Sequence, residues 1–207
     1  MPTYKLTYFP VRGRGEVARQ LMYLGGVPFE DVRIPMAEWP SRKASTPFGQ
    51  IPYLEVDGQP LPQSFAIYRY LAKEFGFAGD SPFEAAWVDA VADQHKDYYG
   101  QIRHTVMVYN GIEQGDKEQL VRDEAIPARD KYYPLLEKLA KDNGSNGHFV
   151  GSSLTWVDLL IADHVGILTG HIPGFLDAYP AVLETVNKIN ETPKLKEWFA
   201  KRPDTKF

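Results

Sequence analysis

The sequence predicts an α/β domain followed by an all-helical domain. Strand-like alternation of apolar residues is confined to the part of the chain before Gly76. A stretch rich in glycine, aspartate, serine and proline follows at residues 76–82, and beyond it only helical periodicity continues. Because a sheet-containing block followed by a helical block separates into two domains, we place the domains at residues 1–77 and 83–207.

The chain opens with a predicted βαβ unit. Apolar and polar residues alternate over Tyr4–Phe9, which predicts a strand. Helical periodicity over Glu16–Leu24 ends at two glycines, and Phe29–Ile34 has the composition of a second strand. Since two strands joined by a helix run parallel, the predicted sheet starts with a parallel pair.

The rest of the first domain predicts a hairpin and a helix. Tyr53–Val56 and Gln59–Leu61 flank Asp57-Gly58, which is a strong signal for a two-residue hairpin turn. Ser64–Phe75 has helical periodicity, whereas Glu38–Thr46 is expected to be an irregular connection. The resulting order, β-α-β-(α)-β-β-α, is the pattern of a thioredoxin-like sheet.

The second domain is predicted to contain helices only. The capping box Thr155-Trp156-Val157-Asp158 starts an almost entirely apolar helix, which should form the core of this domain. Residues 142–147 are rich in asparagine and glycine and predict a loop. The predicted helices cover residues 83–108, 117–141, 156–168, 180–190 and 193–201.

Two motifs in the first domain predict a binding pocket. Ile51-Pro52, an apolar residue before a proline at the entrance to a strand, is a candidate cis bond that would expose the Ile51 backbone. Gln63-Ser64 opens a helix, and a hydroxyl beside the N–H groups of a helix N-terminus suits an anion. Together they indicate a pocket for a small, extended peptide that carries a carboxylate.

Composition restricts the class of protein. The 207 residues carry a net charge of −4, which argues against an electrostatic nucleic-acid binder. No apolar run reaches the ~18 residues of a membrane-spanning helix, and the N-terminus lacks the apolar segment of a secretory signal. Because the chain has no cysteine, any thiol chemistry must use a thiol from a ligand. We expect a soluble, cytoplasmic protein.

Other kinds of site are disfavoured. Residues 13–18 match a dinucleotide-binding fingerprint, GxGxxA, but the block is too short for a doubly wound fold. The acidic pair Glu30-Asp31 also opens the second strand, whereas the fingerprint needs an acid at its end. The histidines have no spacing typical of metal ligands, and no nucleophile elbow is present.

The ordered set of motifs resembles the glutathione S-transferases, and within them the sigma class, which includes invertebrate enzymes and haematopoietic-type prostaglandin D synthase. The resemblance covers essentially the whole chain. It is carried by Tyr4-Lys5-Leu6-Thr7-Tyr8-Phe9, Arg12-Gly13-Arg14-Gly15-Glu16, Trp39 with Lys43, Pro47-Phe48-Gly49-Gln50-Ile51-Pro52, Leu54-Glu55-Val56-Asp57-Gly58, Gln63-Ser64 with Ile67 and Tyr70-Leu71, Thr155-Trp156-Val157-Asp158, and Arg202-Pro203-Asp204-Thr205-Lys206-Phe207.

The resemblance implies the cytosolic glutathione transferase fold and an enzyme that conjugates the glutathione thiolate to hydrophobic electrophiles, as in detoxification. Glutathione would be the co-substrate, and no metal is expected. Tyr8 would be catalytic, donating a hydrogen bond to the glutathione sulfur. The other implied contacts are the glycine end of glutathione on Trp39, Lys43 and Gln50, the cysteinyl unit on the backbone of Ile51 before Pro52, the γ-glutamyl end on Gln63 and Ser64, and Arg14 near the sulfur or the second substrate.

The resemblance also implies a homodimer. Asp97 of one subunit would reach the γ-glutamyl ammonium of the glutathione bound to the other subunit. Some relatives bind a divalent metal with paired acids at this point, but here the neighbour is Lys96, which argues against a metal site. The second, apolar substrate is expected near Phe9, Gly13, Arg14, Ile102, His104, Leu160, His164 and Phe207.

Taken singly, these residues also have structural interpretations. Tyr8 could be a core aromatic, Ser64 a plain N-cap, Arg14 a solvated cation at a helix start, and Asp97 one more surface charge. Two other functions stay open: a glutathione-dependent prostaglandin D isomerase, and a non-catalytic carrier of haem or other hydrophobic ligands. Turnover of a chloronitrobenzene substrate separates the catalytic from the non-catalytic class.

Overall fold

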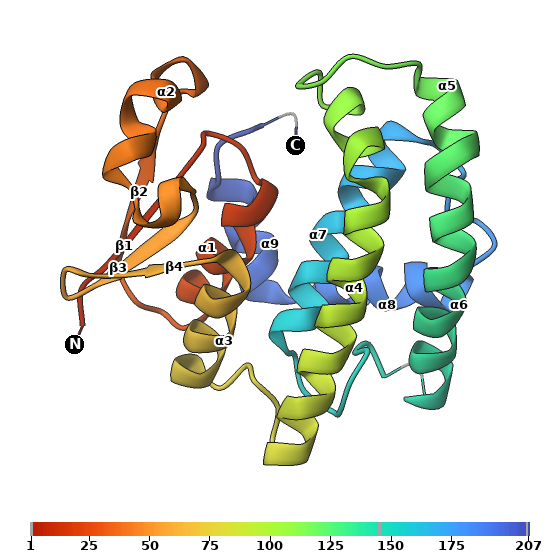
Figure 1. Ribbon diagram of the computed structural model, residues 1–207. Coiled ribbons are helices and arrows are strands. Elements are labelled where there is room, and N and C mark those ends of the chain that lie inside the picture. The colour runs from red at the N-terminus through yellow and green to blue at the C-terminus, as the bar shows by residue number, and fades with distance from the viewer. Residues whose placement is uncertain (1, 145, 206) are drawn as a thin grey trace. The chain divides into compact units, whose positions relative to one another are not determined.

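The computed structural model describes residues 2–144, 146–205 and 207. The contacts divide the chain into two compact units, Met1–Ala78 with Thr192–Phe207, and Gly79–Glu191 (Figure 1). This division differs from the predicted domains 1–77 and 83–207, because the C-terminal helix α9 packs on α1 of the first unit. As the borders of independently folding domains, residues 77 and 83 stay a prediction.

The first unit contains a four-stranded mixed sheet in the order β2-β1-β3-β4. β1 and β2 are parallel, as predicted, and the other two pairs are antiparallel. This arrangement confirms the thioredoxin-like α/β fold. The elements are β1 (Tyr4–Tyr8), α1 (Glu16–Leu24), β2 (Phe29–Arg33), α2 (Trp39–Arg42), β3 (Tyr53–Val56), β4 (Gln59–Pro62), α3 (Ser64–Phe75) and α9 (Pro193–Lys201).

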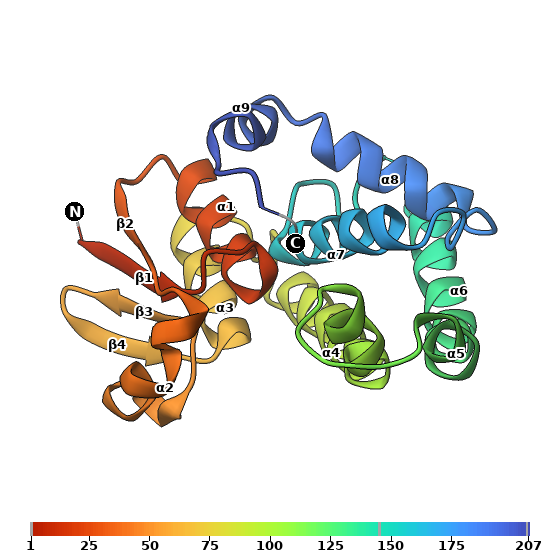
Figure 2. The same ribbon diagram turned by 90° about the horizontal axis from the view of Figure 1, so that it is seen from above.

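One face of the sheet forms the core of this unit. Tyr4, Leu6 and Tyr8 alternate along β1 and are all buried, as is Leu54 opposite Leu6 on β3. Figure 2 shows α1 and α3 on the same side of the sheet, where the two helices contact each other. Because Tyr8 is the last residue of β1, its side chain lies at the end of this core, beside the loop that leads to α1.

Two connections in this unit differ in how well the sequence predicted them. The hairpin turn is confirmed, with Asp57 at φ 49° and Gly58 at φ 79°, the left-handed pair that a two-residue turn requires. The segment 38–46, expected to be irregular, instead contains α2 and a short 3-10 turn at Lys43–Ser45. Pro40, in the first turn of α2, has the φ that a helix start needs and explains why so short a helix forms.

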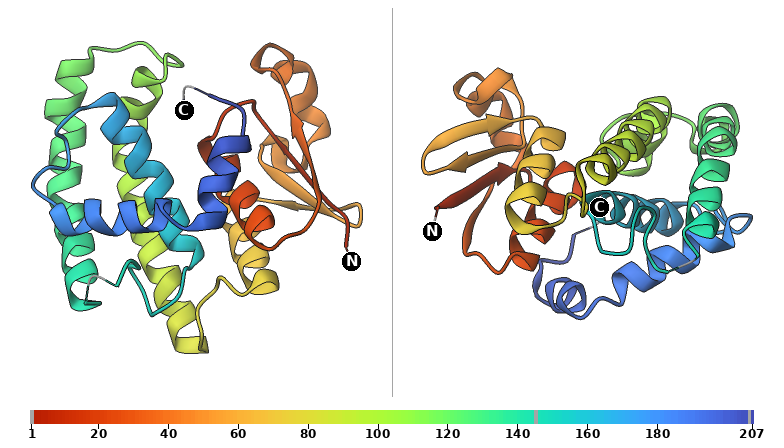
Figure 3. Two further views of the ribbon diagram at one scale, coloured as in Figure 1. Left: turned by 180° about the vertical axis from the view of Figure 1, so that it is seen from behind. Right: turned by 90° about the horizontal axis from the view of Figure 1, so that it is seen from below.

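The second unit is a helical bundle. Figure 3 shows it from behind and from below, and contacts join α4 with α6 and α7, and α8 with α6 and α7. α7 forms its core, as predicted, with nine of its residues buried. The helices are α4 (Pro82–Tyr109), α5 (Lys117–Leu120), α6 (Ile126–Asp142), α7 (Trp156–His171) and α8 (Pro180–Asn190).

The predicted helix over 117–141 contains a π turn. A π turn at Val121–Ala125 separates α5 from α6. Pro127 follows this turn, and a proline has no N–H for the regular helical bond and its ring displaces the carbonyl four residues earlier. The helical stretch predicted over 117–141 is therefore confirmed as helical from Lys117 to Asp142, and the π turn within it was not predicted.

The capping box at the start of α7 is confirmed. The Asp158 carboxylate accepts hydrogen bonds from the Thr155 N–H at 2.8 Å and the Thr155 hydroxyl at 2.9 Å. It also accepts the N–H of Phe149 at 2.8 Å, so this fully buried carboxylate fixes the preceding loop as well. Within the described ranges, no helix combines the length and apolar character needed to cross a membrane.

Candidate active site

Tyr8 is placed by the strand that carries it and by the loop that follows. Its side chain is 8% exposed. The Tyr8 hydroxyl accepts a hydrogen bond from the backbone N–H of Arg14 at 3.2 Å. A hydroxyl oxygen that accepts one hydrogen bond can still donate its own proton, so this contact orients the group without consuming its donor.

The loop between β1 and α1 is tightly constrained. Gly13 has φ 38°, and a Cβ added there would lie 3.1 Å from the Tyr8 hydroxyl. The Arg14 carbonyl accepts the Tyr68 hydroxyl of α3 at 2.6 Å. The predicted residue Arg14 therefore acts in this structure through its backbone, while its side chain is exposed.

The residues implied for the glycine end of glutathione lie on α2 and the turns after it. Trp39 is half-buried, and its ring meets Phe9 edge to face with 5.6 Å between centroids. Lys43 and Gln50 are both exposed. Trp39 is thus packed toward the loop that carries Phe9, next to Tyr8 in the sequence, whereas Lys43 and Gln50 present polar groups to solvent.

The predicted cis bond between Ile51 and Pro52 is confirmed. The preceding residues Phe48 and Gly49 have φ values of 56° and 60°, and Gln50 returns to extended backbone. A left-handed phenylalanine is rare and marks a turn held by its surroundings. The Ile51 backbone enters β3 from this turn.

Gln63 and Ser64 lie at the N-terminus of α3. Gln63 is the N-cap and has φ 75°, a strained value for a non-glycine residue that is common at binding sites. Ser64 is the first helical residue, so the interpretation of Ser64 as a plain N-cap is wrong. Gln63 makes no side-chain capping hydrogen bond, and Ser64 is 8% exposed. A hydroxyl at the N-terminus of a helix suits an anion.

A side-chain bond joins two of the predicted segments. The Gln63 amide donates to the Gln50 side-chain oxygen at 3.0 Å, across thirteen residues of sequence. The turn before β3 and the start of α3 are therefore adjacent. The register pairs Thr7 near the end of β1 with Tyr53 at the start of β3, and Tyr53 with Pro62 at the end of β4. The connections after β1, before β3 and after β4 therefore leave the sheet at the same end of the strands. They carry the predicted residues Arg14, Gln50, Ile51 and Gln63, and flank Tyr8 and Ser64.

Asp97 belongs to the second unit. It is exposed on α4, and its backbone carbonyl accepts the Gln101 side chain at 3.3 Å. Its role at a glutathione site stays a prediction.

Part of the expectation for the second substrate is wrong. Ile102 is fully buried and His164 is 6% exposed, so neither offers surface to a ligand. The His164 ring packs against His95 with 4.8 Å between centroids and against Tyr98 with 5.6 Å. His104 is half-exposed and pairs with Glu124 at 3.2 Å.

Sequence reasoning missed Arg19, which is fully buried in α1. Its guanidinium carbon lies 6.0 Å from the centroid of the Tyr8 ring. The available signal was the pair Glu16 and Arg19, which lie three residues apart in a helix whose other residues are mostly apolar. Charged residues on a buried helix face are rare unless they are paired.

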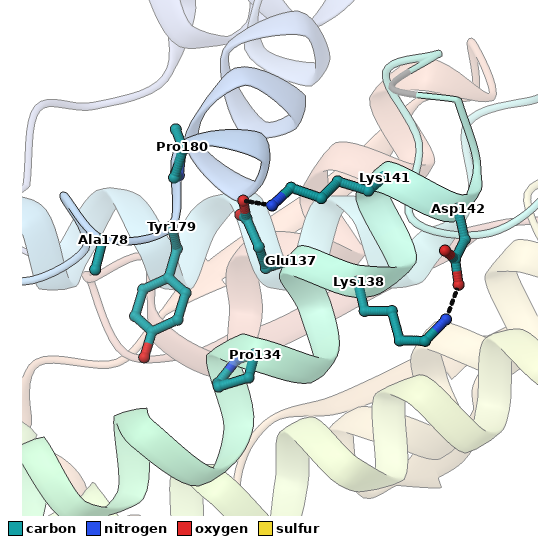
Figure 4. Close-up of a pocket in the computed structure, with 8 residues that line it drawn as sticks. All are labelled: Pro134, Glu137, Lys138, Lys141, Asp142, Ala178, Tyr179 and Pro180. Atoms are coloured by element: carbon teal, nitrogen blue, oxygen red, sulfur yellow. Dashed lines mark hydrogen bonds and ion pairs between the residues drawn. The ribbon is translucent and has the colours of Figure 1, made fainter.

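Two surface cavities are lined by residues other than those predicted for the site. The first, of about 510 Å³ on the second unit, is shown in Figure 4. Glu137 in its wall accepts the Val182 N–H at 3.1 Å and pairs with Lys141 at 2.9 Å. Burial opposes ionisation, but these hydrogen bonds outweigh it and lower the pKa of Glu137. The second cavity, of about 470 Å³, lies on the sheet face that carries Thr7 and Tyr53, opposite the face of Tyr8.

The described residues contain no group of three or more His, Cys, Asp or Glu side chains placed to hold a metal ion. The residues around Tyr8 and at the start of α3 offer hydroxyl, amide and backbone N–H groups instead. Such groups suit a peptide with a carboxylate and a polar sulfur.

Three solved structures similar to this chain bear on class, assembly and activity. A structure titled as a Nu-class GST from Haemonchus contortus is 47% identical, with a TM-score of 0.90 over 100% of both chains. A monomeric Na-GST-3 from Necator americanus is 43% identical, with a TM-score of 0.94 over 99% of this chain and 100% of that one. Prostaglandin synthase D of Nilaparvata lugens is 34% identical, with a TM-score of 0.84 over 98% and 100%.

Family comparisons cover both units. The N-terminal domain of glutathione S-transferase matches residues 4–73, and the C-terminal domain matches residues 101–202. The curated "Glutathione S-transferase 1" of Ascaris suum is 47% identical over 207 residues, which is 100% of each chain. The chain belongs to the glutathione S-transferase family.

Proposed function

We propose that this protein is a glutathione transferase that conjugates the glutathione thiolate to small hydrophobic electrophiles. The observation that carries the proposal is the Tyr8 hydroxyl, which accepts the Arg14 N–H at 3.2 Å at the end of β1. Accepting this hydrogen bond orients the hydroxyl and does not use the hydroxyl's own proton. Full-length identity of 47% to the Ascaris suum glutathione S-transferase supports the same activity.

The chemistry that Tyr8 supplies is stabilisation of a thiolate. A free thiol ionises near pH 8.5, and only the thiolate is strongly nucleophilic. A hydrogen bond to a charged acceptor contributes roughly 1.5–3 kcal/mol, which lowers the thiol pKa by about one to two units. At pH 7 roughly a quarter to three quarters of the bound thiol would then be ionised, against about 3% of a free thiol. Its position beside an apolar substrate would add the effect of proximity.

Glutathione is held along its length by the residues at the ends of the strands. Its γ-glutamyl carboxylate lies at the start of α3, where Ser64 contributes a hydroxyl and the first turn contributes N–H groups. The Gln63–Gln50 hydrogen bond pre-positions the two amide side chains. The other contacts are Trp39, Lys43 and Gln50 at the glycine end, the Ile51 backbone before Pro52 at the cysteinyl unit, and Arg14 beside the sulfur.

The class, assembly and location are also proposals. We propose a sigma-class, cytoplasmic homodimer in which Asp97 serves the partner's glutathione, with residues 1–77 as the glutathione-binding domain and most of the second-substrate site in residues 83–207. The exposure of Asp97 on α4 is compatible with such a contact. The similarity to a prostaglandin synthase supports a test for glutathione-dependent isomerase activity as a second candidate function.

Turnover of 1-chloro-2,4-dinitrobenzene with glutathione tests the main proposal. Tyr8→Phe removes only the hydroxyl, and the loss of about 2–3 kcal/mol should lower turnover roughly 30- to 150-fold while most glutathione affinity remains. Tyr53→Phe is the matched control, because Tyr53 lies on the opposite face of the sheet. Turnover of Tyr8→Phe close to wild type across pH 6–8 would refute the role of Tyr8.

Mixed subunits test the role of Asp97. In a heterodimer of Asp97→Ala and Ser64→Ala subunits, a cross-subunit contact puts both lesions in one pocket and leaves the other intact. Titration with glutathione should then recover about half of the wild-type sites. If Asp97 acts within its own subunit, each pocket keeps one lesion, and no site of wild-type affinity is found. A chain that sediments as a monomer at assay concentrations contradicts the proposed assembly.

A further inference from the structure

We propose that Arg19 is a positioning residue for Tyr8, and this proposal rests on the proposed function. Arg19 lies on α1 and is fully buried. Arg19 is not one of the residues that the family resemblance implies for glutathione binding. Its side chain instead donates hydrogen bonds to backbone carbonyls of the loop that follows Tyr8, and so fixes the position of the Tyr8 hydroxyl.

The guanidinium group donates hydrogen bonds to consecutive parts of this loop. One terminal nitrogen of Arg19 is 2.8 Å from the Val11 carbonyl and 3.4 Å from the Arg12 carbonyl, and the other is 3.4 Å from the Phe9 carbonyl. The loop therefore bends around a single buried cation. Its far end supplies the Arg14 N–H that orients the Tyr8 hydroxyl at 3.2 Å.

Arg19 and Tyr8 also lie close to each other. The guanidinium carbon is 6.0 Å from the centroid of the Tyr8 ring, within the range of a cation–π contact. Gly15 allows this approach, because a Cβ added there would be 2.7 Å from Tyr8 Cδ1 and 3.1 Å from both terminal nitrogens of Arg19. Loop, ring and cation are packed with no room for a side chain between them.

Carboxylates balance the buried charge of Arg19. Its Nε lies 3.0 Å from Asp31 on β2, and a terminal nitrogen lies 3.4 Å from Glu16. Glu16 is itself buried and accepts hydrogen bonds from Trp198 and Arg202, each at 2.7 Å. We call these five residues the Glu16–Arg19 network.

The network connects the loop to the end of the chain. Arg202 and Trp198 belong to the C-terminal segment of the first unit, and the Arg12 N–H donates to the Phe207 carbonyl at 2.7 Å. The C-terminal segment and Arg19 therefore both hydrogen-bond the same loop. A disturbance at Arg202 should reach Tyr8 through Glu16 and Arg19.

Arginine suits this position and lysine does not. Arg19 bonds three carbonyls and two carboxylates in different directions, which its planar guanidinium with five donors can serve at once. An ammonium group has three donors and no fixed plane. Arg19→Lys keeps the positive charge but removes the planar set of five donors. The variant therefore distinguishes an effect of loop positioning from an effect of charge alone.

The experiment compares Arg19→Lys with Arg33→Lys. Arg33 lies opposite Tyr8 on β2, and its side chain pairs with the other oxygen of Asp31 at 2.8 Å. It therefore controls for the loss of an Asp31 ion pair at the same strand level. The readouts are the pKa of the enzyme-bound glutathione thiol, from ultraviolet thiolate absorbance, the kcat with chlorodinitrobenzene, and the glutathione Kd by calorimetry. All are measured well below each variant's melting temperature.

We expect Arg19→Lys to raise the bound-thiol pKa by roughly half a unit to one unit, toward the ~8.5 of an unperturbed thiol. The kcat should fall about five- to tenfold or more, while Kd changes less than about threefold, because a displaced hydroxyl loses its effect on the thiolate but not the binding groups on α3. Arg33→Lys should leave all three values near wild type. Wild-type values for Arg19→Lys, or equal effects in both variants, would overturn the proposal.

A second variant and a reference keep the test decisive. If Arg19→Lys does not fold, Arg202→Gln, at a residue only 19% exposed in its side chain, should raise the bound-thiol pKa in the same direction by a smaller amount. An unchanged value would overturn the proposal. Wild type and Tyr8→Phe are assayed in parallel. If the wild type shows no turnover, the proposed function is refuted. If Tyr8→Phe loses turnover but Arg19→Lys does not, only the role of Arg19 is refuted.

Discussion

Each unit buries a cluster of polar side chains, and the two clusters are built differently. In the first unit, the Glu16–Arg19 network places oppositely charged groups in direct contact. Backbone carbonyls accept further hydrogen bonds from Arg19, and the Trp198 indole donates one to Glu16. In the second, a cluster of His95, Tyr98, Tyr132, Tyr133 and His164 packs ring against ring, and we call it the histidine–tyrosine cluster.

The pKa values follow from this difference. Burial lowers the pKa of His95 well below its usual range, and lowers that of His164 to about 3, so both rings are neutral at physiological pH. Burial raises the pKa of Tyr132 and Tyr133, which are likewise neutral. The network with paired charges lies beside the candidate site, where fixed geometry matters, whereas the neutral cluster serves packing and makes the helical unit sensitive to acid.

The largest expected effect comes from breaking the Glu16–Arg19 network. Glu16→Leu removes the carboxylate that Arg19, Trp198 and Arg202 contact and leaves a buried cation with fewer partners. We expect a loss of about 3–5 kcal/mol in the free energy of unfolding, measured by urea denaturation. A loss under about 1 kcal/mol would show that the network contributes little to stability.

The histidine–tyrosine cluster should set the acid limit of stability. The pKa of His164 is lower in the folded state than the ~6.5 of an unfolded chain, so the folded state binds fewer protons. Stability is therefore complete above pH 6.5 and falls as the pH drops toward about 3. Between pH 6.5 and 5, His164 alone should cost about 2 kcal/mol of unfolding free energy.

His164→Phe tests this sign. The His164 ring contacts the rings of His95, Tyr98 and Tyr99 from α4. The variant should lose about one proton from the pH dependence of unfolding, and so flatten the slope below pH 6.5. Tyr99→Phe, which alters a ring in contact with His164 without removing a histidine, is the control and should keep the wild-type slope. Identical slopes in His164→Phe and wild type would contradict a neutral buried His164.

The smallest effect is expected for an exposed ion pair. Glu38 and Arg42 lie 3.4 Å apart, but their side chains are 49% and 60% exposed. Glu38→Gln should change the free energy of unfolding by less than about 1 kcal/mol, and less at higher salt. A larger change by urea denaturation would mean that charge itself, and not burial, determines the strength of the Glu16–Arg19 network.

The sequence predicted elements with strong local signals and missed those set at long range. The bounds of α1, α3, α8 and α9 match the predictions, because glycine or proline marks the ends of these helices. The π turn at Val121–Ala125 was missed, since a proline's effect on the preceding turn depends on packing.

The site divides in the same way. The positions of Tyr8 at the end of β1 and Ser64 at the start of α3 were predicted from local patterns. The Gln63–Gln50 bond and the contacts of Arg19 join segments distant in sequence, and no local pattern specifies them. Resemblance to a family supplied the predicted site residues, whereas the structure supplied Arg19, which hydrogen-bonds the loop after Tyr8.

The pKa of the glutathione thiol bound to wild type and to Tyr8→Phe is the most direct test of the central claim, that the Tyr8 hydroxyl stabilises the thiolate. Thiolate absorbance is titrated with saturating glutathione and no electrophile, so that binding and chemistry do not interfere. We predict a pKa about one to two units below the ~8.5 of a free thiol in wild type, and a value near the free thiol in Tyr8→Phe. Equal pKa values in the two proteins would contradict the claim.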